Sequence, residues 1–291
     1  MQDMFIEKIK ILLNHKHPFK LLLGGILRRS GLSMLFTIDR GYYKIKFYPT
    51  TGSVTLFAMP AFRQEDDAFY ISYLKKDDIV VDVGANIGTE ALLSASLVKE
   101  DGKVYTFEPN PRIYKYLLKN IKLNGFHNIE PFCTAIGDEN SIVELTDLRN
   151  EDMNHIIVDK SDNIRTVKTK LSRLEDLVPA TIKRINLLKI DTEGYELFVL
   201  KGAGNLLEKT DCIYYESWEQ LYNQFGYKTQ DILLYLKDRD FKIYRVVGKE
   251  TICEIKNIDN YVSSKFENLI AVKDVDAFTK RTEYKVETKQ S

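Results

Sequence analysis

The 291-residue sequence has little cysteine and no long apolar run. Its three cysteines, Cys133, Cys212 and Cys253, lie far apart and form no CxxC pair. This argues against a disulfide framework and a structural zinc site, and it is typical of a reducing compartment. No window reaches the ~18 consecutive apolar residues of a membrane-spanning helix. Asp3 and several lysines interrupt the N-terminal apolar run, which therefore lacks the h-region of a secretory signal. We expect a cytoplasmic protein without a transmembrane span.

No charge of one sign dominates, because 42 basic residues balance 42 acidic ones and the pI is near 6.9. A nucleic-acid-binding domain usually carries a basic surplus, so we expect no nucleic-acid partner. Residues 19–36, FKLLLGGILRRSGLSMLF, are an apolar and basic exception. We predict a helix there that caps the main domain. A peripheral contact with a membrane surface is the alternative that this composition leaves open.

Short strand-like runs alternate with helical patterns from Ile79 onward. These runs are rich in β-branched or aromatic residues and cover 79–83, 103–107, 128–133, 185–190 and 212–216. Such alternation predicts an α/β fold with a mostly parallel sheet and helices on both faces. Two later runs, 242–247 and 268–273, are expected to complete the sheet with antiparallel pairing.

The chain is predicted to divide into three regions. Residues 1–70 form an N-terminal extension with a helix and, at 41–60, a β-hairpin that turns at Thr-Thr-Gly. Residues 71–275 form the α/β domain, in which two strands flank a polar loop at 149–164. Residues 276–291 are polar and are expected to form a frayed C-terminal tail.

The first strand of the series ends in the turn DVGANIGT. Open α/β sheets bind ligands at the carboxyl ends of such strands. The dinucleotide fingerprint G-x-G-x-x-G needs a second glycine where this turn has Asn86, and no G-K-[ST] of a P-loop follows. An acid beside the turn disfavours a phosphate and favours a cationic ligand. S-adenosylmethionine carries an ammonium and a sulfonium but no phosphate, and we expect it to contact Asp82, Gly84, Asn86, Gly88 and Thr89.

Three further positions are predicted to hold the adenosine. Glu108 follows the second strand, 24 residues after Gly84, near the ~20 residues at which such folds place an acid on the ribose hydroxyls. A carboxylate accepts from both vicinal hydroxyls, and Pro109 stiffens the loop behind it. The backbone around Ala135, after the third strand, is expected to face the adenine ring.

Four motifs together resemble a known family. VVDVGANIGTEAL, VYTFEPNPRIYKYLLKNIKLN, LLKIDTEGYELFVLKGA and CIYYES, between Ile79 and Glu216, resemble the successive motifs of the FkbM-type S-adenosylmethionine-dependent O-methyltransferases. The resemblance implies a Rossmann-like class I methyltransferase fold with a seven-stranded sheet. It also implies methyl transfer to a hydroxyl of a saccharide, a glycan or a related natural product. Residues 1–60 match none of these motifs.

The motif KIDTEGYE places Asp191 at the end of a predicted strand and Glu193 close behind it, and CIYYES places Glu216 at the end of the next. We expect these carboxylates to share one crevice with the cofactor, which Asp191 also contacts. A base that takes the proton of the acceptor hydroxyl assists transfer, and crowding raises the pKa of one carboxyl in such a group. Each of the three is a candidate base, and His155 in the polar loop is another.

Other roles for these acids remain open. Asp191 or Thr192 also suits a helix cap, and Glu193 is within sequence reach of Lys189 and Lys201. Carboxylates are ligands that Mg²⁺ accepts, and a bound Mg²⁺ would activate a sugar diol. Nothing in their spacing demands a cation, so Mg²⁺ is possible but not indicated, and no residue is assigned as a metal ligand. Tyr195, Trp218 and Tyr222 suit either an acceptor site or the core.

Two other classes of function compete with a methyltransferase. A nicotinamide-dependent oxidoreductase or epimerase of a sugar nucleotide needs the diphosphate turn that Asn86 interrupts. A non-catalytic nucleoside-binding scaffold would need no carboxylates near the cofactor, yet this chain has Asp191, Glu193 and Glu216. The sequence favours the enzyme. It leaves the acceptor open between a free saccharide, a lipid-linked glycan and a polyketide.

Overall fold

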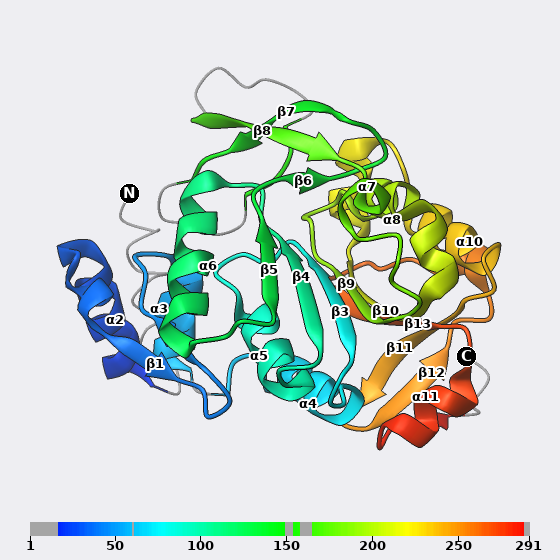
Figure 1. The fold of residues 1–291 in the computed structure, drawn as a ribbon, viewed down its shortest axis with the longest axis horizontal. Helices are drawn as coiled ribbons and strands as arrows, with labels where there is room; N and C mark the ends of the chain where they lie inside the picture. Colours follow the sequence, from blue (N-terminus) through cyan, green and yellow to red (C-terminus); the bar gives the residue numbers. More distant parts are fainter. Residues whose placement is uncertain (1–16, 60, 149–153, 158–164, 288–291) are drawn as a thin grey trace.

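A nine-stranded sheet forms the centre of the protein, in the order β14-β12-β11-β13-β10-β9-β3-β4-β5 (Figure 1). The structure is a computed structural model, and it describes residues 17–59, 61–148, 154–157 and 165–287. The parallel strands are β3 (Ile79–Val83), β4 (Lys103–Phe107), β5 (Ile129–Phe132), β9 (Ile185–Ile190) and β10 (Thr210–Ser217). They are the five strands predicted from the sequence, and the predicted parallel arrangement is confirmed.

Four more strands extend the sheet beyond β10. β13 (Glu267–Val272) runs antiparallel to β10, and β11 (Lys242–Gly248) runs antiparallel to β13, as the sequence predicted. These two complete a seven-stranded sheet. β12 (Thr251–Glu254) folds back onto β11, and β14 (Lys285–Glu287) pairs with β12. The sheet is therefore wider than expected, because the free edge of β11 is covered by chain that follows it.

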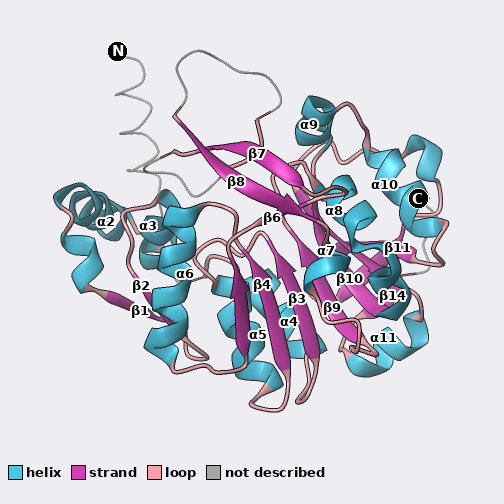
Figure 2. Cartoon of the chain, turned by 45° about the horizontal axis from the view of Figure 1, so that its top comes forward, coloured by secondary structure: helices cyan, strands magenta, loops and turns pink. Residues whose placement is uncertain are grey.

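Helices cover both faces of the sheet (Figure 2). One face packs against α4 (Gln64–Tyr73), α5 (Thr89–Val98), α6 (Pro111–Asn124) and α11 (Val275–Arg281), and the other against α7 (Leu174–Leu177), α8 (Glu196–Ala203) and α10 (Thr229–Lys237). Alternate strand residues separate the two cores: Val80 and Val104 face the first group of helices, whereas Val81 and Tyr105 face the second. β9 is buried along its whole length, which accounts for its nearly continuous apolar sequence.

A smaller sheet lies at the carboxyl ends of the central strands (Figure 1). It contains β6 (Ala135–Ile136), β8 (Thr166–Ser172) and β7 (Ser141–Thr146) in that order. The two strands predicted around the polar loop are thus confirmed as β7 and β8. Of that loop the structure describes 154–157, where Ile156 bridges to Leu145 and thereby places the segment beside the end of β7.

The hairpin predicted at 41–60 is wrong in its second half. β2 (Lys44–Lys46) pairs instead with β1 (Thr37–Asp39), and Thr-Thr-Gly opens the helix α3 (Thr51–Ala58). The hydroxyl of Thr50 caps this helix by accepting a hydrogen bond from the Ser53 amide at 3.2 Å. The cap, together with burial of Val54 and Leu56, outweighs the β-branched residues that suggested a strand.

The predicted N-terminal helix is α2 (Pro18–Ser30), which a short 3₁₀ turn, η1 (Leu32–Leu35), follows. It packs on α3 at Gly24, where an added Cβ would lie 3.2 Å from a methyl group of Val54. The predicted helix is therefore present, and this contact joins it to α3 within the N-terminal extension. In the described part of the chain, no helix combines the length and the apolar character needed to cross a bilayer.

The segment predicted as a frayed tail, 276–291, packs against the domain as far as Glu287. Phe278 of α11 and Tyr284 before β14 are 3% and 6% exposed. Two aromatic side chains in an otherwise polar segment were enough to anchor it, because each buries a large apolar area.

Candidate functional site

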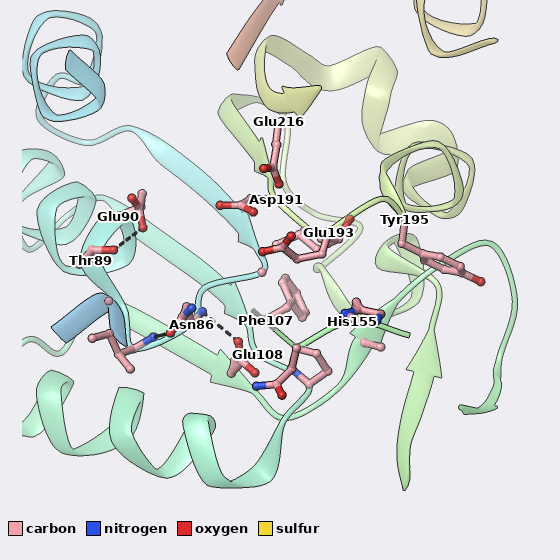
Figure 3. Close-up of a pocket in the computed structure, with 18 of the residues that line it drawn as sticks. Asn86, Thr89, Glu90, Phe107, Glu108, His155, Asp191, Glu193, Tyr195 and Glu216 are labelled. Atoms are coloured by element: carbon pink, nitrogen blue, oxygen red, sulfur yellow. Dashed lines mark hydrogen bonds between the residues drawn. The ribbon is translucent and has the colours of Figure 1, made fainter. Parts of the chain in front are cut away.

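A cavity of about 400 Å³ opens at the carboxyl ends of β3, β4, β9 and β10. Most of the predicted site residues line it: Gly84, Asn86, Thr89, Glu108, Pro109, Ala135, His155, Asp191, Glu193 and Glu216. Figure 3 shows many of these side chains converging from separate elements. Asp82 and Gly88 are absent from the cavity wall formed by the described residues. Asp82 is 1% exposed behind the turn, and a Cβ at Gly88 would meet a Leu117 methyl at 2.6 Å, so helix packing explains this glycine.

The backbone amides of residues 84–88, in the turn after β3, all donate to groups within the protein. The amides of Gly84 and Ala85 both donate to the Phe107 carbonyl at 3.0 Å, and the Asn86 amide donates to Glu108 Oε2 at 2.9 Å. The next amide donates to the Asn86 side chain, and that of Gly88 donates to the Ala85 carbonyl. A diphosphate-binding turn relies on such amides being directed at the ligand, so this turn does not suit a dinucleotide.

Gly84 is required by a close contact across the site. Its φ is +83°, and an added Cβ would lie 1.7 Å from the Asp191 carbonyl oxygen. No side chain fits there. The strand β9 can therefore approach the turn closely enough for Asp191 to enter the same cavity.

Glu108 is a buried carboxylate held in a fixed orientation. It is 6% exposed, and its oxygens accept hydrogen bonds from the amides of Asn86 at 2.9 Å and Asn110 at 2.8 Å. Burial raises its pKa to about 7, although these two amides lower it. Next to it, Phe107, Pro109 and Ala135 provide apolar surface. A carboxylate beside an apolar slot suits a ribose diol and a flat base.

Asp82 does not line the cavity but forms an ion pair with the buried Lys189. Lys189 Nζ lies 3.2 Å from Asp82 Oδ1 and 3.5 Å from Asp191 Oδ2, and it donates to the Gly84 carbonyl at 2.8 Å. Burial lowers the pKa of Lys189, but attraction to the two carboxylates outweighs this effect and leaves the pKa above its ordinary value. Lys189 thus ties the turn to β9 and orients Asp191.

Arg63 and Glu90 form a second charged pair in the cavity wall. Glu90 is in the first turn of α5 and also accepts from the Thr89 hydroxyl at 2.6 Å. Arg63 lies before α4 and is 3.5 Å from Asp66. Its Nε is buried and has no hydrogen-bond partner among the described residues. The pair offers both charge signs to a zwitterionic ligand.

An acidic cluster in the cavity wall contains Asp191, Glu193 and Glu216 (Figure 3). Their carboxylate oxygens lie within 4.8 Å of one another. Burial, followed by the charge of Asp191, raises the pKa of Glu216 well above its ordinary value. Asp191 shows the opposite shift, because attraction to Lys189 outweighs burial and lowers its pKa.

Asp191 does not cap the following helix. The start of α8 has no side-chain cap, and Glu196 instead holds the loop before it: its Oε1 accepts from the Thr192 amide at 2.8 Å, the Thr192 hydroxyl at 2.9 Å and the Gly194 amide at 3.3 Å. Glu193 adopts a left-handed φ of +55°, which turns its side chain toward Asp191 (Figure 3). The loop therefore presents two carboxylates to the cavity while a third holds it in place.

The remaining candidates divide between cavity and core. His155 lines the cavity, and its amide donates to the Thr146 hydroxyl at 3.1 Å. Tyr195 and Trp218 also line it. Tyr222 is 1% exposed and donates to the Glu216 carbonyl at 2.8 Å, so it belongs to the core.

Comparison with known proteins identifies the family. The family model described as methyltransferase FkbM domain matches residues 82–243, more than half of the chain. The chain belongs to the FkbM methyltransferase family. The predicted resemblance is confirmed, and the seven-stranded order with its antiparallel β13 is the Rossmann-like methyltransferase fold that it implied.

Individual relatives of this FkbM methyltransferase are distant. Hexuronic acid methyltransferase AglP of Haloferax volcanii is 27% identical over 145 residues, which are 49% of this chain and 56% of the relative. 2-O-methyltransferase NoeI of Sinorhizobium fredii is 29% identical over 168 residues, 52% of this chain and 68% of that protein. The solved structure of methyltransferase FkbM from Methylobacillus flagellatus KT aligns with a TM-score of 0.43 at 15% identity, over 85% of this chain and 58% of that one.

Sequence reasoning missed three charged residues of this FkbM site. Lys189 stands in the mostly apolar strand INLLKI, and a lysine at a buried position indicates a partner charge. Glu90 follows the glycine turn directly and could have been weighed with it. No sequence feature indicates that Arg63 lies in the site, because its segment FRQEDDAF has the composition of a solvated turn.

Proposed function

We propose that the protein is an S-adenosylmethionine-dependent O-methyltransferase that acts on a hydroxyl of a saccharide, a glycan or a related natural product. The observation that carries this proposal is one cavity with a nucleoside end at Glu108 and an acidic end at Asp191, Glu193 and Glu216. The amides of residues 84–88 donate to groups within the protein, which argues against the nicotinamide-dependent alternative.

Each end of the cavity has residues that fit the cofactor. Glu108 would accept from the ribose hydroxyls, and the apolar surface around Ala135 would take the adenine. Arg63 suits the carboxylate of the methionine part, and Glu90 suits its ammonium. When bound, S-adenosylmethionine supplies an electrophilic methyl group on a sulfonium centre.

The acidic end would position and activate the acceptor. A hydroxyl loses its proton as it is methylated, and a positioned base contributes roughly 10²–10⁴-fold. The two carboxylates Asp191 and Glu216 have opposite pKa shifts, which separates a permanent anion from a stronger base. Glu216 is our first candidate for the base, with Glu193 and His155 in the same cavity as the others. Alignment of the hydroxyl by these groups supplies a further part of the rate.

A saccharide acceptor is supported by one relative, which is named a hexuronic acid methyltransferase. Transfer to oxygen is supported by a second, which is named a 2-O-methyltransferase. Tyr195 and Trp218 add aromatic surface to the cavity, and such faces suit sugar rings. A cavity with three carboxylates favours a neutral sugar over an acidic one. We therefore propose a neutral saccharide hydroxyl as the acceptor.

The outer face of α2 suits an anionic membrane surface, and this suits a lipid-linked acceptor. Phe19 and Ile26 are 85% and 55% exposed. Residues 17–38 include Lys20, Arg28 and Arg29 but no acid. Apolar side chains flanked by basic ones bind anionic interfaces. The helix packs on α3, whose Thr51 and Leu56 line the cavity, so membrane contact would bring the cavity close to the lipid.

Calorimetric titration tests the cofactor, with S-adenosylhomocysteine, S-adenosylmethionine and a reduced nicotinamide dinucleotide as ligands. We expect the two sulfur nucleosides to bind and Glu108→Ala to abolish this binding, while the exposed Glu139→Gln keeps it. Transfer from methyl-labelled S-adenosylmethionine to neutral and acidic saccharides then tests the reaction. Binding of the dinucleotide alone would refute the proposal. Binding of the nucleosides without transfer to any hydroxyl would favour the scaffold alternative.

A further inference from the structure

The acidic cluster of Asp191, Glu193 and Glu216 has the geometry of a cation site. Asp191 comes from the end of β9, Glu193 from the loop that follows it and Glu216 from β10. One oxygen from each lies within 4.8 Å of the others. Cis ligands in an octahedral Mg²⁺ site are ~3.0 Å apart and trans ligands ~4.2 Å, for bonds of about 2.1 Å. A movement of each oxygen by up to about 1 Å would bring the three onto one cation.

Glu216 provides independent support for a ligand at this point. The residue is 6% exposed, yet its Oε2 is buried without a hydrogen-bond partner among the described residues. No described Lys or Arg forms an ion pair with it. Figure 3 shows its carboxylate directed at Asp191 and Glu193. A buried carboxylate oxygen without a donor is costly, and a cation would satisfy it.

The neighbouring basic residues, Lys189 and Arg63, form no ion pair with Glu216. Lys189 lies 3.5 Å from Asp191 Oδ2 but is also held by Asp82 and by the Gly84 carbonyl. Arg63 pairs with Glu90 and Asp66. Neither forms an ion pair with Glu216, so the cluster retains an excess of negative charge at its buried end.

We propose that Asp191, Glu193 and Glu216 bind one hard divalent cation of the Mg²⁺ class. All three donors are carboxylate oxygens, which such cations prefer over nitrogen or sulfur. Three protein ligands leave open coordination positions toward the cavity, where two vicinal hydroxyl oxygens of an acceptor fit. This last step rests on the proposed methyltransferase function, whereas binding of the cation does not.

The cation would change the role of the cluster. As a Lewis acid it lowers the pKa of a bound hydroxyl, and as a template it fixes the oxygen that is methylated. The carboxylates then serve as ligands and not as the base. His155, which lines the same cavity, then becomes the candidate to accept the proton. The sequence left Mg²⁺ binding open, because the acids are suitable ligands, but their spacing did not indicate the site.

Titration with Mn²⁺, followed by electron paramagnetic resonance, tests the proposal on the full chain without cofactor or acceptor. We expect one Mn²⁺ to bind per chain and Mg²⁺ to displace it. Changes in the groups that only orient metal ligands weaken binding by about 10–100-fold. Glu216→Gln, Glu193→Gln and Asp191→Asn should therefore each weaken Mn²⁺ binding by at least about tenfold, while the matched control Glu139→Gln, an exposed acid outside the cavity, should not.

Two further measurements distinguish loss of the cation site from misfolding of a variant and from failure of the proposed methyltransferase function. Binding of S-adenosylhomocysteine reports whether each variant still forms the cofactor site, and in Glu216→Gln it should be retained. Mg²⁺ should raise the melting temperature of the wild type and not that of Glu216→Gln. Absence of stoichiometric Mn²⁺ binding, or equal binding by Glu216→Gln, would overturn the cation site. Neither result would bear on cofactor binding.

Discussion

Lowering the pH from 8 to 6 should weaken the binding of S-adenosylhomocysteine about tenfold, because the Glu108 carboxyl gains a proton over this range. Burial raises its pKa to about 7. The carboxyl is then ionised in about nine-tenths of the molecules at pH 8 and in about one-tenth at pH 6. Only the ionised form can accept from both ribose hydroxyls while it keeps its two amide donors. Calorimetry across this pH range measures the effect, and Glu108→Gln should bind weakly with no such slope. A slope that persists in Glu108→Gln would show that another group controls binding.

Glu108 should make the stability of the fold depend on pH in the opposite direction to nucleoside binding. The pKa of Glu108 rises from 4.5 in the unfolded chain to about 7 in the folded one, so the folded state keeps its proton where the unfolded state loses it. Stability therefore falls as the pH rises from 4.5 to 7. The full effect is on the order of 3 kcal/mol at pH 8. Glu108→Gln should thus be more stable than the wild type at pH 8 and bind the nucleoside less well. A variant that lost both properties would contradict a role in ligand binding, since it would indicate a structural role.

Three further predictions follow from the contacts of the site and of α2. Gly84→Ala should destabilise the fold by more than about 2 kcal/mol, because the new Cβ would overlap the Asp191 carbonyl; unchanged urea unfolding would contradict this. Lys189→Met should lower the free energy of unfolding by about 3–5 kcal/mol at pH 7, because it leaves buried carboxylates without a counter-ion. The exposed Lys237→Met should change it little, and equal losses in the two variants would refute the argument. Ile26→Asp should reduce co-sedimentation with anionic vesicles, and binding to zwitterionic vesicles of equal strength would refute a role for charge.

The sequence predicted the parallel strands well because each strand between Ile79 and Glu216 is both apolar and bounded by a turn. The cofactor end was predictable for a related reason. Gly84 and Glu108 stand at fixed positions after two adjacent strands, and parallel strands bring such positions together. The hairpin at 41–60 was mispredicted because Val54 and Leu56 suit a buried strand as well as a buried helix face. Only the cap at Thr50 distinguishes the two.

Asp82 shows a different limit of sequence reasoning. An acid next to a glycine turn suits a cationic ligand, and it suits a buried lysine equally well. Which of these it meets depends on β9, more than a hundred residues later in the chain, where Lys189 occupies the position opposite Asp82 in the paired strands. Local patterns do not contain such pairings. The isolated Arg63 belongs to the same class, since only the packing of α4 on α5 brings it to Glu90.

The motif KIDTEGYE can now be understood residue by residue. Its lysine fixes Asp191 and the turn after β3. Gly194 adopts a φ of +104°, and an added Cβ would lie 2.9 Å from the Leu221 carbonyl oxygen, so the loop can pass only with a glycine at this point. The final glutamate, Glu196, accepts hydrogen bonds from the Thr192 and Gly194 amides of the loop before α8. Because Glu196 holds the loop, Asp191 and Glu193 need not, and both line the cavity. The three acids within these six residues therefore have different positions: Glu196 stabilises the loop, and Asp191 and Glu193 line the cavity.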